Sequence, residues 1–168
     1  MNPTELAHAL NKLKVGGKSL NVTPEIPTSA GAYTAADCVG GLLQIKDVMT
    51  CDNGTAILKS IQVRDNANQK QPLTIILFSS QPTGATTTDN SAFAYGTSSF
   101  LKQIAKINIL ATDYETIDSK ATADVDTFGK VLKSVGALDL WAVIITTGTW
   151  RFILSADVLI FSTNMANS

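Results

Sequence analysis

The sequence predicts an all-β protein, an antiparallel β-sandwich of the jelly-roll type with about eight strands. Three observations indicate this fold class. Short apolar or alternating runs recur from Ala32 onward and are separated by turn signals such as Asp52-Asn53-Gly54. The amphipathic helices that would cover both faces of a parallel sheet are missing. The 168 residues amount to about one domain and contain no internal repeat.

The expected strands follow one another at short spacing. Leu73–Phe78 is a continuous apolar run, which is typical of a strand buried on both faces. Gly40-Gly41, inside an earlier run, predicts a β-bulge or a close backbone approach. The expected strands are Cys38–Ile45, Thr55–Val63, Leu73–Phe78, Lys106–Ala111, Thr122–Val131, Leu140–Thr147, Trp150–Leu154 and Ala156–Ser162.

Three further local expectations concern the body. Within Thr55–Val63 the alternation is imperfect: even-numbered positions would share one face, and odd-numbered positions such as Ile61 the other. One small internal helix is expected over Ser99–Ile104, with Thr97 or Ser98 as its N-cap. The stretch 113–120 is polar, and no strand is expected there.

The chain divides near residue 31 into an N-terminal arm, residues 1–31, and a β-sandwich domain, residues 32–168. In the arm, Pro3–Lys14 is expected as a short amphipathic helix with Thr4 as its N-cap. Such a short helix is marginal in isolation, so it needs its own body or a neighbouring chain to pack on. Its apolar face and the two prolines that follow it are the candidate interface residues: Leu6, Leu10, Leu13, Pro24 and Pro27.

Charge and composition exclude several function classes. The 13 Lys+Arg against 14 Asp+Glu give a net charge of −1, so nucleic acid is not expected as a partner. The longest apolar stretches are far shorter than the ~20 residues of a membrane-spanning helix, and the first residues lack the pattern of a secretory signal. We therefore expect neither a membrane partner nor export.

Ionisable side chains offer few catalytic candidates. The single histidine, His8, is expected to be solvated on the polar flank of the arm helix. Asp113 and Glu115, and likewise Asp124 and Asp126, stand two residues apart and would share a strand face. Such carboxylates could bind Ca²⁺ or form a glycosidase pair. Solvated strand ends are the preferred interpretation, because the calcium-loop pattern is absent.

The remaining candidate side chains also favour structural roles. Trp141 and Trp150 could form a sugar-stacking platform, but a tryptophan on an apolar strand usually belongs to the core. Cys38 and Cys51 could form a disulfide across a hairpin, but without an export signal we expect them to be reduced and buried. Their spacing does not suit zinc. The serine pairs at 79–80 and 98–99 and Ser134 lack the nucleophile-elbow context, and both nucleotide-binding fingerprints are absent. No catalytic, cofactor-binding or metal residue is assigned.

Surface chemistry points to assembly. Only 16% of the residues are charged, and the chain is rich in Thr and Ser. Symmetric oligomers commonly bury such neutral faces against one another, because no unpaired charge is then left at the interface. We therefore expect the missing charge to correspond to surface that other subunits cover.

An ordered series of segments carries a family resemblance. The series begins with Asp37-Cys38-Val39-Gly40-Gly41-Leu42-Leu43. It continues with Leu73–Phe78 followed directly by Ser79-Ser80-Gln81-Pro82-Thr83, and then with Asp89-Asn90-Ser91-Ala92-Phe93. It closes with Leu140–Thr149. With this series the body resembles small virion structural proteins of tailed bacteriophages, the capsid decoration or cement proteins.

The resemblance implies a jelly-roll body without enzymatic activity or cofactors. It further implies an oligomer, a trimer in this family type, whose partners are itself and the major capsid protein. The protein would be made in the host cytoplasm and reside on the capsid surface of the virion. Two alternatives remain open: a tail, neck or baseplate β-sandwich component, and a glycan-binding adhesion module that uses Trp150, Tyr95 and Tyr114 as exposed stacking rings.

Overall fold

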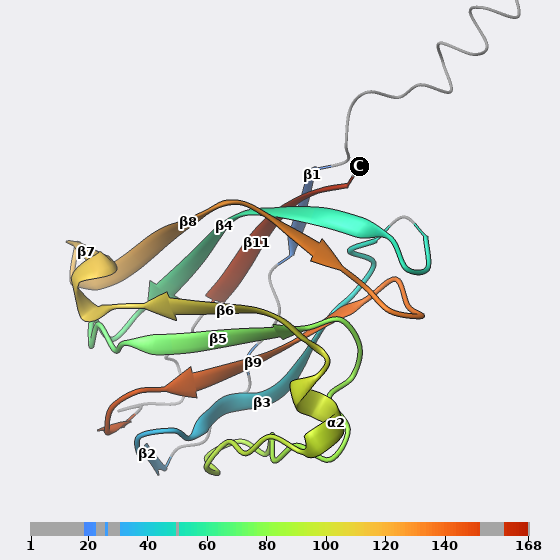
Figure 1. The fold of residues 1–168 in the computed structure, drawn as a ribbon. Helices are drawn as coiled ribbons and strands as arrows, with labels where there is room; N and C mark the ends of the chain where they lie inside the picture. Colours follow the sequence, from blue (N-terminus) through green and yellow to red (C-terminus); the bar gives the residue numbers. More distant parts are fainter. Residues whose placement is uncertain (1–18, 23–25, 27–30, 50, 152–159, 168) are drawn as a thin grey trace, which may run out of the picture.

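The computed structural model describes residues 19–22, 26, 31–49, 51–151 and 160–167. The protein is almost entirely β-structure arranged in two antiparallel sheets, which confirms the predicted β-sandwich. Figure 1 shows the sheets as two layers. The five-stranded sheet contains, in order, β1 (Ser19–Val22), β11 (Ile160–Asn167), β4 (Thr55–Asp65), β8 (Lys120–Lys133) and β7 (Tyr114–Ile117). The four-stranded sheet contains β3 (Cys38–Ile45), β9 (Leu140–Thr146), β5 (Leu73–Phe78) and β6 (Gln103–Ile109).

The strand pairing is that of a jelly roll. The innermost strands β5 and β6 pair with each other, and successive outer pairs are β4 with β8, β3 with β9 and β1 with β11. These nested pairs alternate between the two sheets, so the chain is one long antiparallel hairpin wrapped into a sandwich. β7 extends the five-stranded sheet beside β8, and the short β2 (Ala32–Tyr33) pairs with β10 (Trp150–Arg151).

The main core fills the space between the sheets. Leu58 and Ile61 of β4 belong to one buried cluster with Ile75 and Ile144 of the other sheet. A β-bulge between Leu58 and Ser60 shifts the register of β4, so that its inward positions are even-numbered before the bulge and odd-numbered after it. The expectation from simple alternation is therefore wrong beyond the bulge, where Ile61 faces the core.

Strand β5 is buried on both faces, as its continuous apolar sequence predicts. Leu73, Ile75 and Leu77 belong to the main core. On the opposite face, Ile76 and Phe78 form a second buried cluster with Cys38, Val143 and Ile145. The chain itself covers this outer face, since Phe93 packs against the cluster from residues 79–102, the β5–β6 connection. In Figure 1 this connection lies beneath β3 and β9 and contains the one-turn helix α2 (Thr97–Phe100).

One aspartate fastens the β5–β6 connection to β3. The Asp89 carboxylate accepts hydrogen bonds from the Tyr33 hydroxyl at 2.8 Å and from the Gly40 backbone N–H at 2.7 Å. Backbone hydrogen bonds beside it join Cys38 to Asn90 and Ser91. We call this set of contacts the Asp89 clasp. Because the clasp holds residues 89–91 against β3, it fixes the cover over the second cluster.

The predicted bulge at Gly40-Gly41 is confirmed. The pairing of β3 with β9 shifts register between Val39 and Leu42, and both glycines adopt φ = +74°. A side chain at Gly41 would also meet the Thr87 carbonyl oxygen, because its Cβ would lie 3.3 Å from that atom. The bulge therefore lets the β5–β6 connection approach β3 closely.

Some element boundaries differ from the expectations. Helix α2 ends at Phe100 instead of Ile104, because β6 already begins at Gln103 to pair with Phe78. An unexpected strand, β7, forms in the polar stretch 113–120, after a single 3₁₀ turn at Ala111–Asp113. The last strand, β11, continues to Asn167. β1 lies within residues 1–31 and pairs with β11 in the five-stranded sheet.

The bulge yields a stability prediction. Gly41→Ala places a β-carbon at positive φ and against the Thr87 carbonyl oxygen, and we expect it to lower the free energy of unfolding by about 2–3 kcal/mol. Gly84→Ala is the matched control, because Gly84 has φ = +76° but nothing within 4 Å of the added carbon. In the control, only the cost of an alanine at positive φ remains, so the free energy of unfolding should fall by about 1 kcal/mol. Urea denaturation measures both, and equal losses would contradict the close approach.

Candidate functional site

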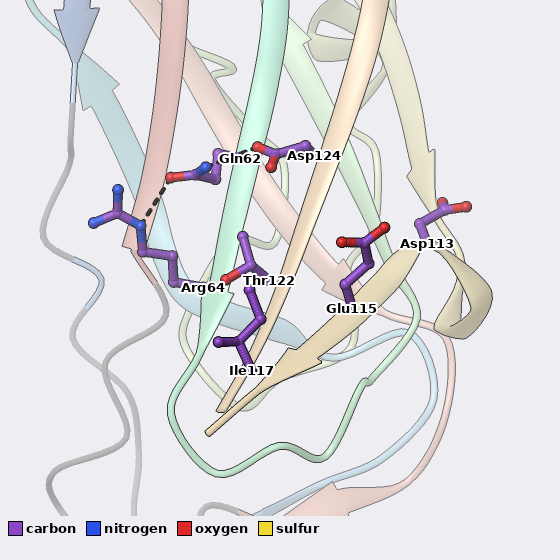
Figure 2. A pocket seen from close by; sticks show the side chains of 7 residues that line it. All are labelled: Gln62, Arg64, Asp113, Glu115, Ile117, Thr122 and Asp124. Atoms are coloured by element: carbon purple, nitrogen blue, oxygen red, sulfur yellow. Dashed lines mark hydrogen bonds between the residues drawn. The ribbon is translucent and has the colours of Figure 1, made fainter. Parts of the chain in front are cut away.

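A polar groove lies on the outer face of the five-stranded sheet. It has a volume of about 440 Å³, and its lining comes from three neighbouring strands and the turn before β7 (Figure 2). Register explains the arrangement, because Gln62 of β4 pairs with Asp124 of β8, and Thr122 of β8 pairs with both Arg64 and Glu115. The lining residues are Gln62, Arg64, Asp113, Glu115, Ile117, Thr122 and Asp124.

A glutamine orders the charged side chains of this groove. The Gln62 amide nitrogen donates to the Asp124 carboxylate at 2.8 Å, and its carbonyl oxygen accepts from Arg64 Nε at 2.8 Å. Figure 2 shows Gln62 between these two groups. Arg64 and Asp124 are both exposed, so their charges are solvated. The groove can therefore offer ordered hydrogen-bond donors and acceptors to a polar partner.

The structure brings together three of the four carboxylates that the sequence singled out. Asp113, Glu115 and Asp124 line the groove, whereas Asp126 lies outside the lining. The Asp113 carboxyl group turns away from the other labelled side chains in Figure 2 and accepts a hydrogen bond from the Leu110 backbone N–H. Across the described ranges, no group of three or more His, Cys, Asp or Glu residues could hold a metal ion. Glu115, Asp124 and Asp126 are exposed, as the preferred interpretation of solvated carboxylates predicts.

An apolar hollow of about 310 Å³ lies on the outer face of the four-stranded sheet. Ile76 and Ile145 belong to its lining, and Phe93 and Tyr95 line it from the β5–β6 connection. The Tyr95 ring packs edge-to-face against Phe93 and Phe100, and its hydroxyl group donates to the Gln103 side chain. Burial raises the pKa of the Tyr95 hydroxyl group. Tyr95 is thus partly exposed but held by its neighbours.

The glycan-stacking set of the sequence analysis is not assembled. Tyr114, one of its three expected exposed rings, is buried at 6% exposure, and this expectation was wrong. Its ring points inward from β7 into the main core, and its hydroxyl group donates to the Gln71 carbonyl oxygen at 3.0 Å. Burial is the main cause that raises the pKa of this phenol, assisted by Asp65 and Asp113. The side chain of Trp150 lies outside the described residues, whereas Trp141 packs against the second cluster, as expected.

The two cysteines differ in their surroundings. Both are free thiols, Cys38 is buried, and Cys51 is exposed, so the expectation of burial holds only for Cys38. Burial raises the pKa of the Cys38 thiol to about 11, with further contributions from the Asp37 and Asp89 carboxylates. A buried, protonated thiol is a poor nucleophile. Cys38 therefore acts as a small apolar residue beneath the β5–β6 connection.

The candidate serines take part in local structure. Ser79 Oγ donates to the Lys102 carbonyl oxygen, Ser98 Oγ to that of Thr83, and Ser99 Oγ to that of Gly96. Ser134 is fully buried, and its hydroxyl oxygen has no hydrogen-bond partner within the described ranges. None of these four hydroxyl groups is bonded to a histidine or a carboxylate among the residues that the structure describes.

The arm residues named by the sequence analysis lie outside the described part of the chain. They are Leu6, Leu10, Leu13, Pro24 and Pro27, and His8 lies there as well. Of the described helices, none is long and apolar enough to cross a membrane. Neither a scan against protein-family models nor a search of curated proteins gives a match for this chain.

The surroundings of the two cysteines predict different reactivities. With Ellman's reagent, the folded protein should release one equivalent of the coloured thiolate rapidly, from Cys51, because Cys38 is buried and protonated. The denatured protein should release two equivalents. In Cys51→Ser the rapid equivalent should disappear. Rapid release of two equivalents from the folded protein would show that Cys38 is accessible.

The serines provide a matched pair for stability. Ser134→Ala removes a buried hydroxyl group without a described partner and should raise the free energy of unfolding by about 0.5–1 kcal/mol. Ser99→Ala removes an equally buried hydroxyl group that bonds Gly96, and should lower it by about 1 kcal/mol. Urea denaturation of both variants measures the change in the free energy of unfolding, which should be a gain for Ser134→Ala and a loss for Ser99→Ala. A loss for Ser134→Ala as large as that for Ser99→Ala would mean that Ser134 has a partner.

Proposed function

We propose that this chain is a non-enzymatic structural protein of a tailed-bacteriophage particle. In this proposal it is a decoration, or cement, protein that binds the assembled capsid as a homo-oligomer, specifically a trimer, and stabilises the shell. Its partners are other copies of itself and the major capsid protein, and its location is the virion surface. The jelly-roll strand order carries the proposal, because many viral capsid proteins have this architecture.

The motif segments of the resemblance support the same proposal. The segment that begins at Asp37 and the one that begins at Asp89 are far apart in sequence but meet in the Asp89 clasp. The late segment joins them, since Thr146 and Asp37 are linked by a backbone hydrogen bond. Residues that act together to hold a connection in place are expected to recur together in a family of structural proteins. The motifs thus have a common structural role in this fold.

The two outer faces of the sandwich differ in chemistry, and this difference also favours assembly. The five-stranded sheet presents Arg64, Glu115 and Asp124 to water, together with Lys59 and Lys130. On the other side, Lys106 is the one charged residue among the described residues that line the hollow beside Phe93 and Tyr95. A protein attached to a shell needs one face for solvent and one for contact, and this molecule offers both.

The mechanism of stabilisation would be mass action. A protein that binds assembled capsomers, but not free subunits, shifts the equilibrium toward the intact shell. Attachment through three copies of the same contact converts weak single contacts into a durable attachment. The arm, through Leu6, Leu10 and Leu13, would contact a neighbouring subunit or the shell.

The proposal predicts a trimer that binds capsids. Light scattering on the purified full chain should give three times the 17.8 kDa chain mass, and the protein should co-sediment with undecorated capsids of the source phage. Decorated capsids should also release their DNA at a higher temperature. Deletion of residues 1–18 should weaken co-sedimentation. A monomer that does not co-sediment with capsids would contradict the proposal, whereas a hexameric ring would assign the protein to the tail or neck.

A further inference from the structure

One end of the sandwich carries a concentration of exposed apolar side chains. Phe100 and Leu101 are 59% and 82% exposed, and Val135 and Leu138 are 56% and 38% exposed. Large apolar side chains scattered singly are normal on a surface, but a contiguous group of them marks an interaction site. We call these four residues the apolar end.

Backbone contacts bring these residues together. The Ser79 N–H donates to the Lys102 carbonyl oxygen at 2.9 Å, and the Val135 N–H donates to the Ser79 carbonyl oxygen at 3.0 Å. Ser79 therefore ties the residue after Leu101 to Val135. The Leu138 carbonyl oxygen accepts from Met49 at 2.8 Å, which joins the β3–β4 connection to the same end. In Figure 1, α2 and the β8–β9 turn lie at this end of the two sheets.

The N-terminal segment, residues 1–18, joins the body at this end. Ser19 pairs with Ala166, Ala166 with Ile57, and Ile57 with Val131, so the start of β1 is level with the end of β8. Val131 is itself 64% exposed. The segment that precedes Ser19 therefore starts from the same end of the sandwich as the apolar end. Its own sequence carries the apolar stripe Leu6, Leu10 and Leu13, which needs a surface to pack on.

We propose that the apolar end of each copy binds the N-terminal segment of a neighbouring copy, with Leu6, Leu10 and Leu13 packed on Phe100, Leu101 and Val135. This inference rests on the proposed function, since it requires an oligomer. In a cyclic oligomer the same end of every copy faces the same way along the axis. The segment of one copy therefore starts on the same side of the oligomer as the apolar ends of its neighbours.

Distance limits how the segment could pack on the apolar end of its own chain. β1 and β8 are three strand spacings apart, about 14 Å, and the second sheet, beyond which α2 lies, is about 10 Å further. Residues 15–18, which separate the expected helix from β1, span at most about 14 Å when fully extended. Within one chain, residues 15–18 would therefore have to be fully extended before the expected helix could reach the apolar end.

The test compares full-length variants by size-exclusion chromatography with light scattering. The double variant Leu101→Asp/Val135→Asp places charges on the apolar end, and Leu10→Asp places one on the stripe. Both should reduce the trimer to the monomer mass, and the β-sheet signal of the far-ultraviolet circular dichroism spectrum should be retained. Leu110→Asp is the matched control, because Leu110 is 56% exposed but follows the far end of β6, away from the apolar end. It should remain trimeric.

The outcomes separate this inference from the proposed function. A wild-type monomer would overturn the proposed trimer, and the inference with it. If the wild type is a trimer and the double variant keeps the trimer mass, the inference alone is overturned. This holds even if Leu10→Asp dissociates, because the stripe would then bind elsewhere. If both variants stay trimeric but their N-terminal segments become sensitive to protease, the segment binds its own chain, which also contradicts the inference.

Discussion

The outer face of the four-stranded sheet is apolar, and the fold depends on keeping that face out of water. Burying Ile76, Phe78, Val143 and Ile145 contributes roughly 2 kcal/mol for each side chain. The β5–β6 connection covers this face, and a connection without regular strands of its own needs specific anchors. The Asp89 clasp supplies them, because one carboxylate satisfies both the Tyr33 hydroxyl and the Gly40 N–H. The bulge at Gly40-Gly41 is what allows that approach.

The low fraction of charged residues is therefore partly explained by the fold of the single subunit. A sandwich whose second sheet is apolar on both faces needs fewer charged positions, and its own connection covers much of the outer face. Within the two sheets, the charge gathers on the five-stranded sheet, where Gln62 hydrogen-bonds both Arg64 and Asp124. The apolar end around Leu101 and Val135 is one surface that the described part of the chain leaves exposed. We therefore expect that end to be a neutral surface that other subunits cover.

Features of the fold that depend on a few neighbouring residues can be predicted from the sequence. The apolar run Leu73–Phe78 predicts a strand buried on both faces, and Gly40-Gly41 predicts the bulge, because both signals lie within a few residues. The bulge in β4 is not predictable in this way, since Lys59 carries no glycine signal and the shift appears only in the pairing with β11 and β8. Strand β7 forms from a polar stretch for a similar reason: pairing with β8 and the inward ring of Tyr114 stabilise it. The groove needs the same long-range register, so sequence finds its carboxylates but not Gln62 or Arg64.

The most direct test of this account is the stability of Asp89→Ala, measured by urea denaturation together with amide hydrogen exchange. Loss of the carboxylate leaves the Tyr33 hydroxyl and the Gly40 N–H without their acceptor, so the free energy of unfolding should fall by about 2–4 kcal/mol. Exchange should accelerate at residues 90–93, beside β3. Asp126→Ala, at an exposed carboxylate on the other sheet, should leave both quantities unchanged. If Asp89→Ala behaved like Asp126→Ala, the clasp would not hold the connection, and the account would be contradicted.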